Sequence, residues 1–136
     1  MVISKIGRSG MIKMPWPDKS MHPNNRKHRL AVAPIRKKYR SDCAWLAREA
    51  KAYFPHMRDL GLHLRITFHP PDRRVRDIDG MLSAIKSGLD GIADVIGVDD
   101  SRWDLTLIRG PVVKGGCVVV EVVEDRKYVP LRGVIS

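Results

Sequence analysis

Residues 62–96 change from one hydrophobic repeat to another, and this change restricts the fold more than any other feature of the chain. In LHLRITFH, residues 62–69, apolar and polar side chains alternate, which predicts a strand with one buried face. From Ile78 to Ile96 the apolar residues recur every three or four positions, which predicts an amphipathic helix. A strand and a helix of this kind bury their apolar faces together when the helix lies on a sheet.

Another strand and another helix are predicted before this pair. The run MIKMPW, residues 11–16, is short and apolar and predicts a first strand. Apolar residues at helical spacing from Ile35 onward predict a first helix that has Pro34 in its first turn and ends before Pro55. Between them, residues of about 17–34 are rich in Pro, Asn and basic side chains and are expected to form a basic loop.

Two further strands are predicted after the second helix, at residues 104–110 and 116–124. The turn signal PVVKGG between them predicts an antiparallel hairpin. Residues of about 125–136 carry no pattern and are expected to form a short tail. The 136 residues are therefore expected to form a single α+β domain, with one mixed or antiparallel sheet and two main helices.

The charge is strongly basic and unevenly placed. Lys and Arg number 25 against 15 Asp and Glu, and the segment from Lys19 to Arg40 holds eight basic residues and no acid. A block of one sign repels itself unless an anion lies against it, so this arm favours phosphate binding, as in a nucleic-acid-binding protein. The alternative is a solvated, flexible arm.

Cysteine usage and hydropathy indicate the compartment. Cys43 and Cys117 are the only cysteines, and neither is part of a CxxC motif, which favours a reduced protein without a disulfide framework. No apolar run approaches the length of about 18 residues that a membrane span needs, and the N-terminus has no hydrophobic signal segment. A cytoplasmic protein without a membrane partner is expected.

The stretch PPDRRVRDIDGML, residues 70–82, combines three arginines with Asp77 and Asp79. These opposite charges could simply neutralise one another on a solvent-exposed surface. Alternatively the arginines bind a polyanion and the aspartates bind a cation. Both aspartates lie where a loop becomes a helix, so they could turn toward one point, although helix capping also favours aspartate there.

The second predicted helix carries a polar stripe beside its apolar one. Asp79, Ser83, Lys86 and Asp90 are spaced by four, three and four residues, and Asp99 and Asp100 follow the helix. An exposed face with one charge pair would explain the stripe. Alternatively, acids without His or Cys favour Mg²⁺ or Mn²⁺, and such an ion at a phosphodiester polarises the phosphate and generates hydroxide.

Several motifs in order resemble the RusA family of Holliday-junction resolvases. These are PDRRVRDID, a helix with a lysine, VDD and PVVKGG. The early MPWP…HPNNR resembles the N-terminal PWPPS-NN-R segment of that family, with a few residues inserted between Pro17 and Pro23. The resemblance extends from about Met14 to Glu124, and it implies a RusA-like fold.

The resemblance implies a Mg²⁺-dependent, homodimeric endodeoxyribonuclease, encoded by a bacterium or a phage, that cuts four-way junctions by paired nicks in recombination and repair. The three essential aspartates of the family fall on Asp77, Asp79 and Asp100. Its essential lysine follows the second aspartate by one helical turn, which is Ser83 here. Lys86 lies one turn further on the same face, and we expect it to take the lysine role. The family's Asn after the second aspartate is replaced by Gly80.

DNA contacts are expected from basic residues around these motifs. The residues expected to bind the backbone are Arg73, Arg74, Arg76, Lys114, Arg26 and Lys27. Asn24 and Asn25 are candidates for DNA contacts or for plain turn residues. Trp103 could wedge into a junction, but core packing is expected at a strand start, and His63 and His69 are expected to face solvent. Two rival functions are a nuclease for other branched DNA or RNA, and a non-catalytic basic nucleic-acid-binding protein.

Overall fold

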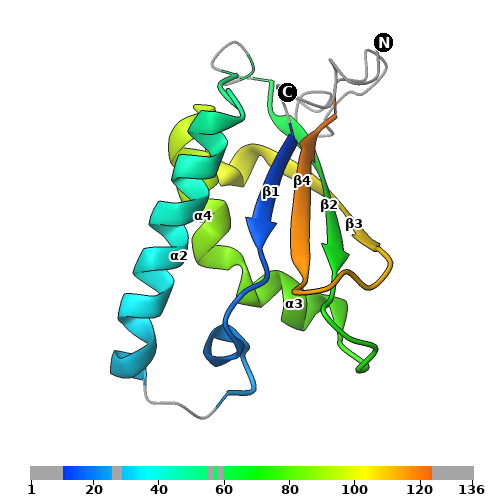
Figure 1. Cartoon of the computed structure of the whole chain (residues 1–136). Helices are drawn as coiled ribbons and strands as arrows, with labels where there is room; N and C mark the ends of the chain where they lie inside the picture. The colour runs from blue at the N-terminus through cyan, green and yellow to red at the C-terminus, as the bar shows by residue number, and fades with distance from the viewer. Residues whose placement is uncertain (1–10, 26–28, 55–56, 58–59, 124–136) are drawn as a thin grey trace.

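A computed structural model describes residues 11–25, 29–54, 57 and 60–123. One sheet has the strand order β1-β4-β2-β3, with β2 and β3 parallel and the other pairs antiparallel. Helices α2 and α4 lie side by side next to this sheet (Figure 1). The predicted α+β class with a mixed sheet is confirmed. The bounds are β1 Met11–Pro15, η1 Lys19–Met21, α2 Arg29–Glu49, β2 Leu62–His69, α3 Ile78–Ala84, α4 Lys86–Ile96, η3 Asp100–Arg102, β3 Trp103–Arg109 and β4 Cys117–Val122.

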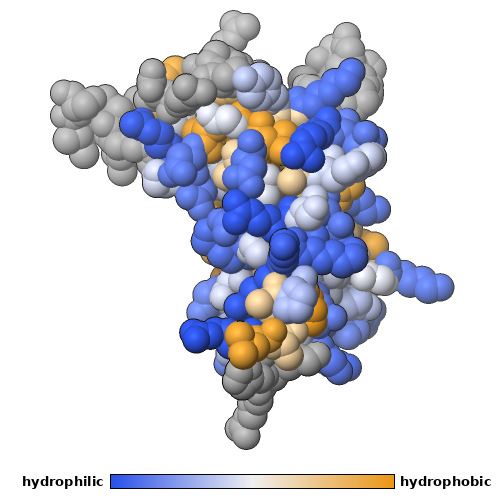
Figure 2. Space-filling view, turned by 90° about the vertical axis from the view of Figure 1, so that its left-hand side faces the viewer, coloured by the Kyte–Doolittle hydropathy of each residue, from blue (hydrophilic) through white to orange (hydrophobic). Residues whose placement is uncertain are grey.

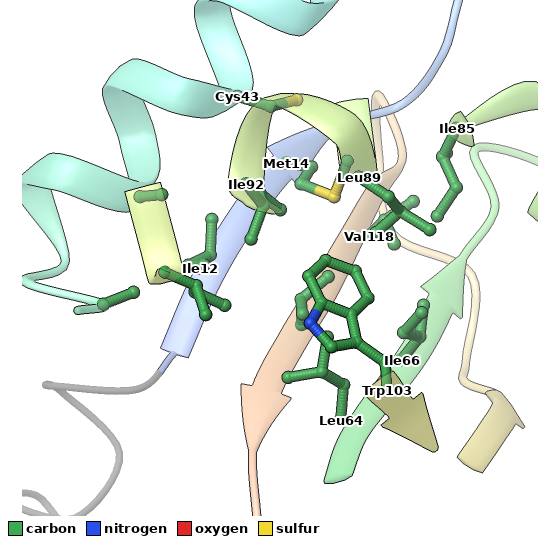
Figure 3. Packing of buried hydrophobic residues seen from close by; sticks show 14 of the residues in the cluster. Ile12, Met14, Cys43, Leu64, Ile66, Ile85, Leu89, Ile92, Trp103 and Val118 are labelled. Carbon is green, nitrogen blue, oxygen red and sulfur yellow. The ribbon is translucent and has the colours of Figure 1, made fainter. Parts of the chain in front are cut away.

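The predicted alternation in β2 is confirmed, and its apolar face forms the centre of the core. Every second residue of the strand is buried, beginning with Leu62. Figure 3 shows strand side chains such as Leu64 and Val118 gathered with Leu89 and Ile92 of α4. Each fully buried aliphatic side chain of this kind stabilises the fold by about 1.5–3 kcal/mol. The sheet and α4 therefore hold the core together.

Trp103 is part of this core, as expected for a tryptophan at a strand start. Its side chain is buried, and its indole N–H donates a hydrogen bond to the Val98 carbonyl at 3.0 Å. His63 and His69 lie on the other face of β2 and are half-buried. Their ring nitrogens are hydrogen-bonded to Thr106 at 2.7 Å and to the Pro111 carbonyl at 2.9 Å.

The predicted hairpin between the last two strands is wrong. β3 pairs with β2 in parallel, and β4 pairs with β1 and with the other edge of β2. The turn at Gly115 and Gly116 is present, with positive φ values of 80° and 71°. It leads the chain past the end of β2 instead of back along β3. The reason lies earlier in the chain, because a strand, a helical crossover and a second strand favour a parallel pair.

The first helix begins earlier and ends earlier than predicted. α2 starts at Arg29, so Pro34 lies beyond its first turn, and the second part of the expected basic loop is helical. Val32 is buried in the core, so the apolar face of the helix begins ahead of Ile35. Lys51 has a φ of 56°, and the Ala52 N–H bonds back to the Ala47 carbonyl, which ends the helix before Pro55.

The predicted second helix is two helices. Ile85 has φ −98° and ψ 7°, which separates α3 from α4, although its side chain is fully buried. The break makes Lys86 the first residue of α4. α4 ends at Ile96, and Gly97 after it lies in the left-handed region, where glycine has no steric penalty. None of the described helices is long and apolar enough to cross a lipid bilayer.

We expect Gly91→Ala to destabilise the protein strongly, because α4 contacts the backbone of α2 at this residue. A Cβ atom at residue 91 would lie 2.1 Å from the Arg40 carbonyl oxygen, which cannot rotate away. The free energy of unfolding should fall by about 1–3 kcal/mol or more, as measured by urea denaturation. The control is Ser41→Ala, an exposed position on α2 that should change it by less than about 0.5 kcal/mol. Equal stability of the two variants would contradict this packing.

Candidate active site

Asp77 and Asp79 lie at the start of α3 with exposed side chains. Asp77 occupies the position before the first helical residue, where an aspartate usually accepts a hydrogen bond from the first turn. Its side chain makes no such bond. Oδ1 of Asp79 accepts from the Gly80 N–H at 2.9 Å. Helix capping therefore does not account for the carboxylate of Asp77.

Lys86 connects two acidic residues that come from different elements. Its ammonium donates to Asp90 on α4 at 2.5 Å and to Asp100 on η3 at 2.9 Å. The hydrogen bonds to Asp90 and then to Asp100 raise the pKa of Lys86 above its usual value. Lys86 is therefore an ammonium group at neutral pH, and it can stabilise negative charge but cannot act as a base.

The neighbouring aspartates Asp99 and Asp100 have different surroundings. Asp99 caps η3, because its carboxylate accepts hydrogen bonds from the backbone N–H and the hydroxyl of Ser101. These bonds lower the pKa of Asp99. Asp100 instead receives the Lys86 ammonium. The structure thus gives Asp99 a local structural role and turns Asp100 toward α4.

Gly80 allows a histidine to approach α3 closely. A Cβ atom at residue 80 would lie 2.8 Å from Nε2 of His22, so the imidazole occupies the space that a side chain there would need. The Asn24 N–H donates to Nδ1 of His22 at 3.2 Å. A neutral ring with Nδ1 as acceptor carries its proton on Nε2. His22 therefore directs a donor toward the segment that contains Asp79.

Arg76 stabilises the arginine-rich loop of residues 71–76 through contacts with several neighbouring groups. It forms a 2.9 Å ion pair with Asp72, and only 19% of its side chain is exposed. Its guanidinium lies 5.4 Å from the ring centre of Trp16, and its carbonyl accepts from Arg109 at 2.7 Å. Arg76 also lowers the pKa of Asp72, with help from Arg74. Its position among these partners indicates that Arg76 shapes the loop.

The other predicted DNA contacts are exposed. Arg73 and Arg74 lie on the outer side of the loop, and Lys114 lies in the turn before β4. Asn24 and Asn25 are exposed after η1, where Asn25 N–H bonds to the His22 carbonyl as in a turn. The remaining two predicted contacts, Arg26 and Lys27, lie outside the described residues.

Helix α2 adds further exposed basic groups. The side of the molecule on which α2 lies is largely hydrophilic (Figure 2). Ion pairs join Lys38 to Asp42 at 2.6 Å and Arg40 to Asp94 at 2.9 Å. Both pairs are solvent-exposed and screened by water, so their basic groups stay accessible to a polyanion. The exposed basic residues of α2 from its start to residue 40 are Arg29, Arg36, Lys37, Lys38 and Arg40.

The predicted ligands fit a divalent cation in their chemistry but are not gathered around one point. Carboxylate oxygens are the donors that Mg²⁺ and Mn²⁺ prefer. In the part of the chain that the structure describes, no group of three or more His, Cys, Asp or Glu side chains could hold a metal ion. The structure brings Lys86 to Asp100 and places Asp77 near Asp79 in the chain. It does not bring Asp100 together with Asp77 and Asp79 as a complete metal site.

Two residues beside these carboxylates were not predicted from the sequence. His22 approaches Gly80, and Trp16 contacts the Arg76 guanidinium. Both lie in the segment MPWP…HPNN, which resembles the N-terminal segment of the RusA family, but that resemblance assigned no role to Trp16 or His22. A glycine near the start of a helix was the one available signal, since glycine often marks a close approach by another group.

The fold and the site define a small α+β protein in which a lysine and several aspartates lie beside a basic surface. No family model matches the chain. A protein of Xylella fastidiosa described as uncharacterized is 36% identical over 113 residues, which cover 82% of this chain and 74% of that protein. The crossover junction endodeoxyribonuclease RusA of Escherichia coli K12 is 29% identical over 119 residues, or 83% of this chain and 92% of RusA. RusA of Shigella sonnei is 28% identical with the same coverage.

The chain belongs to the family of the Xylella fastidiosa protein. It is RusA-like, since it is distantly homologous to RusA over most of its length.

Proposed function

We propose that this protein is a divalent-metal-dependent endodeoxyribonuclease that resolves four-way DNA junctions by paired nicks. The observation that carries the proposal is the 2.9 Å contact between Lys86 and Asp100. It joins Asp100, which the resemblance to RusA identifies as essential, to Lys86, which we assign to the family's lysine role. The two residues come from segments on either side of Gly97. The homology to RusA, whose name describes a crossover junction endodeoxyribonuclease, supports the same activity.

In this proposal each charged residue has one task. Asp77, Asp79 and Asp100 would hold Mg²⁺ or Mn²⁺ once they are drawn together around the ion, and the bound ion would polarise the phosphate and supply a hydroxide nucleophile. Lys86 stabilises the negative charge that develops on the phosphate, because its raised pKa keeps it protonated. Ser83 is exposed on α3 and has no part in this chemistry.

The basic surface binds the DNA backbone in this proposal. Arg73, Arg74 and Lys114 are exposed around the loop, and α2 adds further basic side chains. Phosphate contacts of this kind make affinity depend steeply on salt. A homodimer would place two sites on opposed strands of a substrate that has near two-fold symmetry. Cytoplasmic location and dimerisation stay predictions, and a sizing column measures the latter.

We expect the purified protein to nick a synthetic four-way junction in Mg²⁺ and to leave it intact in EDTA. Duplex, single-stranded DNA and RNA of the same sequence, incubated in parallel, should stay uncut because they lack the branch. Denaturing gels with each strand labelled in turn will show whether the nicks are paired.

The same experiment, extended to flap and fork substrates, separates the rival functions. Equal cutting of flaps, forks or RNA would indicate a nuclease for other branched substrates. Junction binding without cutting in Mg²⁺ or Mn²⁺ would indicate a non-catalytic nucleic-acid-binding protein, and the proposed activity would then be wrong.

A further inference from the structure

A cavity of about 470 Å³ lies between the segment that contains η1 and the loop of residues 71–76. Trp16, Met81 and Ala84 are among its apolar walls, and Lys19 and Arg74 are among its basic lining residues. Its volume falls within the range of about 300–1,000 Å³ that is usual for ligand pockets. The cavity is therefore large enough for one aromatic heterocycle.

The aromatic wall of this cavity is held rigidly. The Arg76 guanidinium lies over the Trp16 ring at 5.4 Å and is itself fixed by the ion pair with Asp72 at 2.9 Å. Gly116 packs against the base of the indole, since a Cβ atom there would lie 2.9 Å from Cβ of Trp16. A fixed aromatic ring loses little entropy when a planar ligand stacks on it.

The charges that border the cavity favour an anion. Two acids border it, but Asp18 accepts a hydrogen bond from the Ser20 N–H at 2.9 Å, and Asp72 is paired with Arg76. Lys19 and Arg74 are exposed: the Arg74 Nε lies 3.6 Å from Asp72, but 82% of the Arg74 side chain is accessible. An aromatic wall with basic side chains around it is the chemistry that binds unpaired nucleic acid, in which bases stack and phosphates meet cations.

The cavity is also joined to the candidate active site. Its loop continues from Arg76 directly into Asp77, and its opposite wall comes from Met81 and Ala84 on α3, the helix that carries Asp79. A strand with a phosphate at these aspartates could therefore place a neighbouring nucleotide at the cavity. The loop and α3 connect the two places without any intervening element.

We propose that this cavity takes one unstacked nucleobase of the strand that is cut, with Lys19 and Arg74 contacting its flanking phosphates. This inference rests on the proposed junction-cutting function. A base beside a branch point is already partly unpaired and costs less to extrude than a base within a duplex. The cavity would thus favour branched DNA over continuous duplex, and it would select one position relative to the branch.

The test is a scan with abasic sites, in which single bases near the branch of a synthetic junction are removed one at a time. Binding is measured by fluorescence anisotropy in EDTA, so that no strand is cut. Removal of the base that occupies the cavity should raise the Kd by about 10-fold, and removal at other positions should change it by less than about twofold. In Trp16→Leu, abasic and intact junctions should bind equally at the sensitive position.

The matched control is Trp45→Leu. Trp45 is 56% exposed on α2 and does not line the cavity, so this variant should keep the 10-fold effect of the sensitive abasic site. If Trp16→Leu does not fold, the wild-type protein still decides the question. A junction with 5-iodouracil at the sensitive position should photocrosslink to the peptide that contains Trp16, and a crosslink elsewhere would overturn the proposal.

The binding experiments distinguish a failure of the nucleobase cavity from a failure of the proposed junction-cutting function. Tight junction binding with no position-specific abasic effect would overturn the nucleobase cavity and leave the junction-cutting proposal intact. Equal affinity for junction and duplex in the same titrations would overturn both.

Discussion

Asparagine at residue 77 or 79 is expected to abolish junction cleavage while junction binding is retained. The substitutions Asp77→Asn and Asp79→Asn keep the size of the side chain and remove the negative charge that a divalent cation needs. The loss of that cation removes several kcal/mol of transition-state stabilisation, so the single-turnover rate in Mg²⁺ should fall by about 10³-fold or more. Binding to the junction in EDTA should be unchanged or tighter, because each variant removes one negative charge from a DNA-binding surface.

Asp94→Asn is the matched control for this prediction. Asp94 is an exposed aspartate on α4 that pairs with Arg40 at 2.9 Å, away from the start of α3. Its replacement should leave the cleavage rate within about twofold and the stability within about 1 kcal/mol. Normal cutting by both Asp77→Asn and Asp79→Asn would show that the active site lies elsewhere.

Lys86→Met should lower the cleavage rate by about 10²–10³-fold, because it removes the ammonium that stabilises developing charge. Methionine keeps the length and the apolar stem of the side chain. Folding should be little affected, since 59% of the lysine side chain is exposed. Single-turnover cleavage of a four-way junction measures the effect, and thermal unfolding followed by circular dichroism confirms that the variant is folded.

Ser83→Ala separates the two candidates for the essential lysine position. Lys86 donates hydrogen bonds to Asp90 and Asp100, whereas Ser83 lies exposed on α3. The serine variant should therefore cut at the wild-type rate. A large loss in Ser83→Ala together with normal cutting by Lys86→Met would reverse the assignment and would place the reacting phosphate nearer to α3.

The elements were largely predictable from the sequence, but their pairing was not. Alternation in β2 and the apolar stripe of α4 follow from burial on one face, which is a local property. The hairpin prediction failed because the Gly115–Gly116 turn is also local, while the partner of β3 is fixed by the crossover through α3 and α4. Strand order depends on such long-range packing, which a turn signal does not contain.

In the candidate site, too, the residues were predictable from the sequence but their contacts were not. Asp77, Asp79 and Asp100 were predicted from their residue types and from the resemblance to RusA. The contact of Lys86 with Asp100 depends on the break at Ile85 and on the turn after α4, so its geometry was not predictable. Arg76 was predicted to bind DNA with its neighbours, and only the structure shows its partners Asp72 and Trp16.

The break at Ile85 separates the rotational phase of α4 from that of α3. In one continuous helix, three added or deleted residues would rotate every later side chain by about 60° and move Lys86 away from Asp100. Because α4 begins anew at Lys86, its orientation is set by its own packing on α2 and the sheet. We therefore expect α4, and Lys86 with it, to keep its orientation when the length of α3 changes.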